Sequence, residues 1–193
     1  MSLGESFSRV LDAARAGAEW GVTALYRDLS DPVLRYLQSQ EPMEAEDIAS
    51  EAWIDVARAL PRFRGGEDDL RRFVFTIARR RLVDHRRKAF RRRTQPVPTE
   101  LMEPHLPKGD VEAEAVGGLT AREGAMALLS RLPPEQAEIV LLRVVGGFTA
   151  DEVARLVGKR AGTVRVLQHR ALSRLAAELA REGVTPERLR AMW

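Results

Sequence analysis

Residues 149–179 read TADEVARLVGKRAGTVRVLQHRALSRLAAEL. Thr149 and Glu152 have the spacing of a helix capping box, so a short helix is expected to begin here and to end at Gly158. A second apolar stripe with helical period begins a few residues later, near Gly162. Its members are Val164, Leu167, Ala171, Leu175 and Leu179. A short helix, a turn containing glycine and a longer helix are typical of a helix-turn-helix.

The second of these helices is predicted to turn a polar face away from its apolar stripe. Arginine, histidine and a branched aliphatic side chain suit the DNA major groove, because a guanidinium can pair with guanine and an aliphatic group can contact the thymine methyl. Arginines at the edges of this face and backbone amides at the helix start could meet phosphates. The candidate DNA-contacting residues are Arg160, Thr163, Arg165, Val166, His169 and Arg170. The alternative is a face that only keeps the domain soluble, and the helix-turn-helix pattern favours DNA binding.

Helical period extends over most of the remaining chain, and no segment alternates apolar and polar residues for long enough to predict a strand. Asp31-Pro32 predicts a helix start before Val33, because proline is favoured at the first helical position. Between residues 44 and 60, apolar residues recur every four positions and acids fall on the opposite face. The apolar positions are Ile48, Ala52, Val56 and Leu60, and the acids are Glu44, Asp47, Glu51 and Asp55. This segment is expected to bury its apolar face and to carry its acids on the opposite face.

Charge is strongly segregated along the chain, although 31 basic and 28 acidic residues leave a net charge of only +3. Residues 79–93 contain eight arginines and Lys88 against one acid, Asp84. Such a run could neutralise many phosphates, and apolar residues within it favour a helix over a disordered tail. Upstream of it, Phe63, Phe73 and Phe75 could stack on unpaired bases, although each alone is also typical of a core residue.

The predicted fold is all-α, with two small helical domains joined by an extended acidic linker. Four prolines and five acids against a single lysine define that linker. The 193 residues are 45% hydrophobic, which is enough to bury the cores of one or two small domains. The predicted boundaries are 1–93 for a helical bundle, 94–120 for the linker, 121–182 for the helix-turn-helix domain and 183–193 for a tail.

The sequence argues against an enzyme. It has no cysteine, its three histidines are scattered, and it lacks the His-Glu-x-x-His, phosphate-binding glycine loop and Gly-x-Ser-x-Gly motifs. No catalytic residue, metal or cofactor is therefore expected. No apolar run approaches the roughly 20 residues that span a bilayer, and the first residues do not read as a signal peptide. We expect a cytoplasmic protein without membrane insertion.

The chain resembles the extracytoplasmic-function (ECF) sigma factors of bacterial RNA polymerase. The resemblance rests on two blocks in the family's order with a linker between them. The first block, region two, runs from AGAEWGVTALYRDLSDPVLRYL (16–37) through AEDIASEAWIDVARALPRFRG (45–65) to RRFVFTIARRRLVDHRRK (71–88). The second, region four, is LLSRLPPEQAEIVLLRVVGGFTADEVARLVGKRAGTVRVLQHRALSRL (128–175). The two blocks together make the resemblance specific.

The resemblance implies a promoter-recognition subunit for core RNA polymerase. The acidic residues Asp47, Glu51 and Asp55 would dock on the clamp helices of the polymerase's largest subunit, and region four would meet the flap. The minus-ten element would be recognised and opened by Phe63, Phe73, Arg79, Arg80, Arg86 and Arg87. The helix carrying Thr163, Arg165 and His169 would read the minus-thirty-five element as duplex, and the acidic linker would run through the active-centre and RNA-exit channels. A sequestering anti-sigma protein is also implied.

Several residues depart from the family's pattern. Phe73 stands where the family often has tryptophan, and Arg80 where it often has asparagine, so the pocket for a flipped base differs in shape or charge. On the reading helix, two positions that hydrogen-bond in the family are aliphatic. Two other functions stay open from the residues alone: a helix-turn-helix regulator that acts without polymerase, and an adaptor whose acidic helix binds a protein while its arginines bind RNA.

Overall fold

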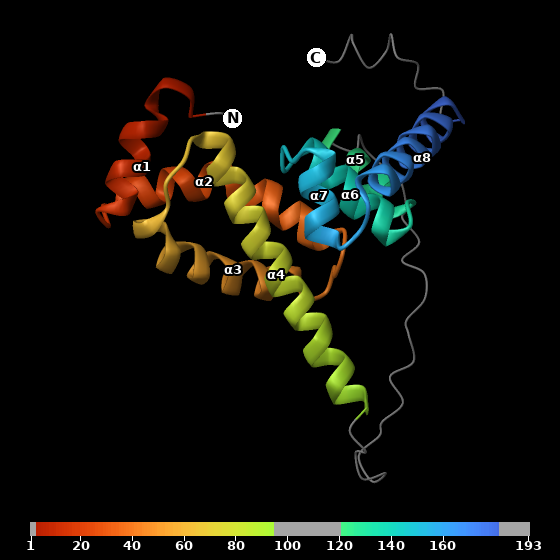
Figure 1. The fold of residues 1–193 in the computed structure, drawn as a ribbon, viewed down its shortest axis with the longest axis horizontal. Helices are drawn as coiled ribbons and strands as arrows, with labels where there is room; N and C mark the ends of the chain where they lie inside the picture. Colours follow the sequence, from red (N-terminus) through yellow and green to blue (C-terminus); the bar gives the residue numbers. More distant parts are fainter. Residues whose placement is uncertain (1–2, 95–120, 182–193) are drawn as a thin grey trace.

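The computed structural model describes residues 3–94 and 121–181 of the chain, and within these ranges every regular element is helical (Figure 1). The first half contains the 3₁₀ helices η1 (Gly4–Ser6) and η2 (Leu60–Arg62) and the α-helices α1 (Phe7–Arg15), α2 (Glu19–Gln38), α3 (Ala45–Ala59) and α4 (Glu67–Thr94). The second half contains α5 (Ala121–Ser130), α6 (Pro134–Val144), α7 (Ala150–Val157) and α8 (Ala161–Arg181). The all-α prediction is confirmed, while the predicted linker from residue 95 onward and the predicted tail lie outside the described residues.

Helices α2, α3 and α4 build the first half around apolar stripes, one of which is the stripe expected between residues 44 and 60. The four stripe residues of α3 and η2 are each at most 4% exposed. They face a stripe of α4 formed by Leu70, Val74, Ala78 and Leu82, and all four of these are at most 2% exposed. Full burial of one such large aliphatic side chain contributes about 1.5–3 kcal/mol. This packing fixes the acidic face of α3 and the arginine-rich α4 side by side.

The predicted helix start at Asp31-Pro32 is wrong, because Pro32 lies inside α2. Proline in a helix interior removes one backbone hydrogen bond and is normally unfavourable. Here Leu29 before the proline and Val33, Tyr36 and Leu37 after it are all buried. Their continuous burial offsets the local cost, so tertiary packing decides the course of α2.

The helix-turn-helix in the second half forms as predicted. The backbone amide of Glu152 donates to Thr149 Oγ1 at 3.2 Å, and the Thr149 amide donates to Glu152 Oε2 at 2.6 Å, which completes the capping box of α7. Gly158 ends α7 with φ 69°, a left-handed conformation that glycine adopts without a side-chain penalty. Helix α8 begins at Ala161, and its Val164 and Ala171 are fully buried.

The two halves also pack against each other. Figure 1 shows α6 and α7 beside α2 and α4. A continuous apolar core joins Tyr36 and Phe75 of the first half to Ile139, Leu142 and Val153 of the second. The sequence did not predict this association. Among the described helices, none is long and apolar enough to cross a membrane.

Candidate functional site

All six residues predicted to contact duplex DNA are exposed: five lie on α8, and Arg160 directly precedes it. Val166 is 49% exposed, and Arg165 makes an exposed ion pair with Asp151, at 3.3 Å from Nη2 to Oδ2. Such a pair contributes little energy, so Arg165 can exchange its partner at low cost. The orientation of α8 is instead held by buried Val164 and Ala171.

Arg143 of α6 supports this helix, and sequence reasoning missed it. Its Nε donates to Gln168 Oε1 of α8 at 3.1 Å, and its Nη1 donates to the Phe148 carbonyl in the turn before α7. One guanidinium therefore connects three parts of the helix-turn-helix. Its position near the end of α6 gave no sign of this role, because Gln168 lies 25 residues away and Phe148 lies in the turn beyond the helix.

The acidic face of α3 divides into exposed and engaged carboxylates. Asp47 and Glu51 are exposed, whereas Asp55 is half-buried and accepts a hydrogen bond from Arg81 Nε at 2.6 Å. Arg81 Nη1 also lies 3.3 Å from Glu51 Oε2. The hydrogen bond with Asp55 raises the pKa of the Arg81 guanidinium above its ordinary value. Of the three predicted docking residues, Asp55 is therefore already used to join α3 to α4.

An aromatic groove lies next to these acids, between α2 and α3. The Tyr26 and Trp53 rings meet edge to face, with centroids 4.9 Å apart. The groove is lined by Tyr26, Ser30, Asp31, Leu34, Glu46, Ala49, Ser50 and Trp53. Tyr26 is 49% exposed, and Ile54, beside Trp53 in the sequence, is 51% exposed. Exposed aromatic surface bordered by carboxylates is typical of a protein-binding site.

Phe63 and Phe73, predicted separately from the sequence, come together at the loop between α3 and α4. Their ring centroids are 5.1 Å apart, and with Arg58, Ala59 and Arg62 they line a shallow hollow. An apolar floor with two arginines at its rim can receive an unpaired base and its phosphate. Phe75, by contrast, is fully buried against Tyr36 and belongs to the core.

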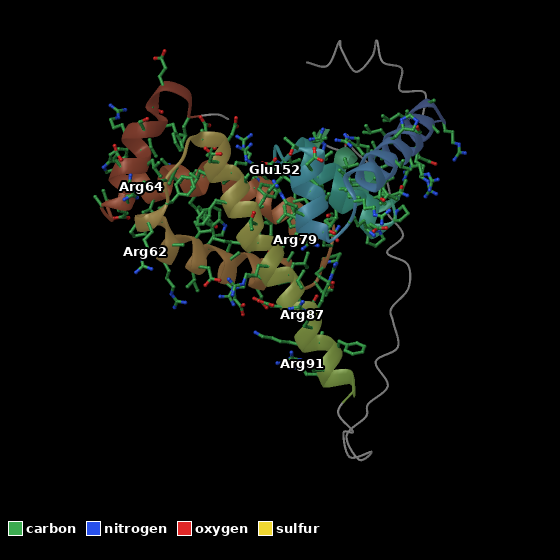
Figure 2. The ribbon with its side chains drawn as sticks, viewed as in Figure 1. Arg62, Arg64, Arg79, Arg87, Arg91 and Glu152 are labelled. Atoms are coloured by element: carbon green, nitrogen blue, oxygen red, sulfur yellow. The ribbon has the colours of Figure 1, made fainter. Side chains whose placement is uncertain are left out.

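The loop that carries Phe63 is tied down by local hydrogen bonds. Arg64 Nη1 donates to the carbonyls of Pro61 and Phe63, at 3.2 and 2.8 Å. Asp69 Oδ2 accepts from the Gly66 amide at 3.0 Å, and this bond, followed by the one from Arg72, lowers the pKa of the Asp69 carboxyl. Figure 2 shows Arg62 and Arg64 at this loop, at the opposite end of α4 from Arg87 and Arg91.

The four arginines predicted for strand opening fall into two pairs. Arg80 and Arg87 are exposed, and with Phe73 they recur every seven residues, which places all three on one face of α4. Arg86 donates to Glu41 Oε1 at 2.6 Å and to the Gln40 carbonyl at 3.0 Å. Arg79 points instead toward the second half of the chain (Figure 2). Arg80 and Arg87 thus lie on the same face of α4 as Phe73 of the hollow, whereas Arg79 and Arg86 are hydrogen-bonded to other residues of the chain.

Arg79 belongs to a buried polar cluster where the two halves meet. Its Nε donates to Glu138 Oε1 of α6 at 2.9 Å, and the Tyr36 hydroxyl donates to the same oxygen at 3.0 Å. Burial, together with the negative charge of Glu138, raises the pKa of the Tyr36 phenol well above its ordinary value, which keeps the hydroxyl protonated. Gln40 Nε2 donates to the Pro134 carbonyl at 3.1 Å nearby. None of these contacts was visible in the sequence, because the partners lie 59 to 102 residues apart.

Comparison with known families matches both halves. Residues 22–92 match the family described as Sigma-70 region 2, and residues 122–175 match Sigma-70, region 4. The chain is 33% identical over 190 residues to the ECF RNA polymerase sigma factor SigD of Mycobacterium tuberculosis, covering 93% of this chain and 87% of that protein. It is 40% identical over 134 residues to the ECF RNA polymerase sigma factor ShbA of Streptomyces griseus, covering 68% and 70% of the two chains.

Solved structures share the fold. CnrH in complex with the cytosolic domain of CnrY aligns with a TM-score of 0.53 at 16% identity, covering 92% of this chain and 99% of CnrH. The sigma factor RpoE, in complex with the anti-sigma factor NepR from Bartonella quintana, aligns with a TM-score of 0.51 at 21% identity, covering 91% and 95%. At these identities the likeness concerns the arrangement of helices alone.

Proposed function

Because the chain belongs to the ECF sigma factors of bacterial RNA polymerase, we propose that it binds core polymerase and directs initiation at promoters through separate minus-ten and minus-thirty-five contacts. The observation that carries the proposal is the presence of both sigma regions, in order, each with an exposed surface of suitable chemistry. A helix-turn-helix regulator without a polymerase role would not need the match over residues 22–92.

The core-binding surface in this proposal is the exposed part of α3 with the groove beside it. Asp47 and Glu51 supply negative charge, and the Tyr26–Trp53 pair supplies apolar area. An interface of this kind combines an aromatic anchor with charged groups that steer the partner. Asp55 takes a positioning role, because its carboxylate holds Arg81 and so fixes α3 on α4. The partner here is the clamp-helix segment of the largest subunit, and region four meets the flap.

The strand-opening surface is the hollow of Phe63 and Phe73 together with the exposed arginines of α4. A base displaced from the minus-ten duplex can stack on the rings, and Arg58 or Arg62 can meet its phosphate. Arg80 and Arg87 continue along the same face as Phe73 and can follow the strand. Arg79 and Arg86 add to this surface once the hydrogen bonds of Arg79 to Glu138 and of Arg86 to Glu41 and Gln40 are broken.

The duplex-reading surface is the exposed face of α8. Arg165 and His169 can hydrogen-bond to base edges, and Val166 can contact a thymine methyl. Arg160 and Arg170 lie at the margins of this face and suit phosphates. The domain boundaries predicted above follow the same division of roles, with residues 1–93 serving the minus-ten element and 121–182 the minus-thirty-five element.

An anti-sigma protein and a cytoplasmic location complete the proposal. RpoE was solved in complex with the anti-sigma factor NepR, and this chain shares its fold. A sequestering partner would need to cover at least one of the three surfaces described above.

In vitro transcription with core polymerase tests the function directly. Core enzyme supplemented with the chain is expected to initiate at defined sites on fragments of the genome that encodes it, and core enzyme alone is not. Mapping the start sites then gives the promoter elements. Absence of any specific transcript, with core enzyme shown active on a non-specific template, would contradict the proposal.

A further inference from the structure

The buried cluster between the two halves carries an inference that rests on the proposed function and goes beyond it. Glu138 lies in the second turn of α6 with its side chain only 11% exposed, and within the described residues it accepts hydrogen bonds from Tyr36 and Arg79, both in the first half of the chain. Tyr36 reaches it from α2 and Arg79 from α4. One carboxylate therefore fastens the region-four half to two helices of the region-two half.

A second, more open contact supports the same association. Arg72 Nε of α4 lies 3.7 Å from Oε1 of Glu152, which is part of the α7 capping box. Figure 2 shows Arg79 and Glu152 where α4 meets the second half. Next to the Arg79 contact, a cleft is lined by residues of α4, three of them arginines, and by Leu156 of α7: Thr76, Arg79, Arg80, Val83, Asp84, Arg87 and Leu156. The second half thus lies against the arginine-bearing side of α4.

A carboxylate and a phosphate compete for the same guanidinium. Both accept charge-assisted hydrogen bonds from arginine, so Glu138 occupies on Arg79 the place that a DNA phosphate would take. If Arg79 turned to a phosphate while the halves stayed together, Glu138 would keep a buried charge with only Tyr36 as a partner. Loss of one partner from a buried ion pair is strongly unfavourable. Binding of Arg79 to DNA and separation of the two halves are therefore coupled.

We propose that this chain has a closed state in which Glu138 acts as an internal substitute for a DNA phosphate on Arg79, and that the closed state must open before α4 can engage a promoter strand. The interaction surface consists of Tyr36, Gln40, Arg72 and Arg79 on the first half, and its occupant is the region-four half of the same chain. Opening frees the Arg79 guanidinium and widens the path to Arg80 and Arg87.

The distance between the halves tests the closed state in the free protein. The chain has no cysteine, so spin labels can be placed at Ser8→Cys in α1 and Ala176→Cys in α8, both exposed positions. Pulsed electron spin resonance is expected to give one narrow distance distribution for this labelled parent. Glu138→Gln should broaden the distribution toward longer distances, and Arg79→Gln, which breaks the pair from the other half, should do the same.

Glu135→Gln is the matched control. Glu135 lies in the first turn of the same helix and pairs with Lys159 within the second half, so its loss removes the same charge without touching the interface. It should leave the distances unchanged. Circular dichroism of each variant verifies that the helices remain. A broad distribution in the parent, or identical distributions in the parent and Glu138→Gln, would overturn the proposal.

The affinity of the chain for single-stranded DNA tests the competition between Glu138 and a phosphate for Arg79. With fluorescein-labelled 20-nucleotide oligothymidine, Glu138→Gln is expected to bind about tenfold more tightly than the parent if about a tenth of the parent is open. Adding Arg79→Gln should lower the affinity of Glu138→Gln, because the open chain then lacks one phosphate contact, and Glu135→Gln should not reproduce the gain. Equal affinities for Glu138→Gln and Glu135→Gln would overturn the competition. Both experiments use the free chain, so failure to initiate transcription would contradict the proposed function without altering them.

Discussion

Two acids on one face of α3 are expected to behave differently when each is replaced by its amide. Asp55→Asn removes the charge that accepts the Arg81 Nε hydrogen bond at 2.6 Å, whereas Asp47 is exposed and no hydrogen bond or ion pair is described for it. Asp55 thus supports the bundle, while Asp47 is available to a partner. Both substitutions keep side-chain volume nearly constant.

The expected change in the free energy of unfolding depends on how far the Asp55–Arg81 pair is buried. The side chains of Asp55 and Arg81 are 25% and 27% exposed, between the buried and the fully solvated case. A hydrogen bond to a charged group contributes about 1.5–3 kcal/mol, and partial exposure reduces it, so we expect Asp55→Asn to lower the free energy of unfolding by about 1–2 kcal/mol. Asp47→Asn should stay within about 0.5 kcal/mol, as is usual for exposed positions.

Urea unfolding followed by circular dichroism measures this difference. A parallel pull-down with core polymerase, at a temperature where both variants are folded, measures binding. Asp47→Asn should weaken the pull-down with unchanged stability, and Asp55→Asn should lower stability. The reasoning is refuted if Asp55→Asn is as stable as the parent, or if Asp47→Asn is destabilised to the same extent. The result also bears on any test that reverses all three acids together, since loss of binding in that variant would include a loss of stability.

Three further outcomes follow from the described contacts. Arg165→Ala should relax base preference at particular minus-thirty-five positions by about 1–3 kcal/mol, measured with a library of promoter duplexes; a uniform loss over all sequences would instead indicate a phosphate contact. Phe73→Ala should reduce open complexes, detected by permanganate reactivity of unpaired thymines, while duplex binding by α8 is retained; normal opening would contradict the role of the hollow. Because the pKa of Tyr36 is raised in the folded chain above its ordinary value of 10.0, its contribution to stability is complete below about pH 10 and is lost as the pH rises toward the folded pKa. Tyr36→Phe should therefore show a smaller loss of stability above pH 10 than Tyr26→Phe, and equal losses would contradict the argument.

Local signals in the sequence predicted local structure well. The Thr149–Glu152 capping box, the Gly158 stop and the four-residue stripe of α3 all depend on residues within a few turns of each other, and all are confirmed. Pro32 is the exception, because burial of α2 on both sides of the proline outweighed its local preference. In such cases the deciding energy comes from other helices, which a single sequence does not display.

The sequence predicted which residues belong to the candidate site, but it did not predict how these residues are arranged in space. The exposure of Arg165 and His169 follows from helical period alone. The meeting of Phe63 with Phe73 depends on how the loop before α4 folds back. The Glu138–Arg79 pair needs the two halves to associate across a long segment, and nothing near either residue in the sequence marks it. The roles of the individual DNA-contacting residues stay predictions.

The recurrence of Phe73, Arg80 and Arg87 on one face of α4 means that the helix fixes the spacing between these three side chains. The 28-residue helix has no interruption, so successive members of the series are about 10 Å apart at 1.5 Å per residue. Spacing along a bound strand is then set by a rigid backbone rather than by flexible loops. A single inserted residue between Phe73 and Arg80 would rotate everything beyond it by about 100° and turn the guanidinium groups away from the base hollow. The length of this segment is thus constrained more tightly than the identity of most residues along it.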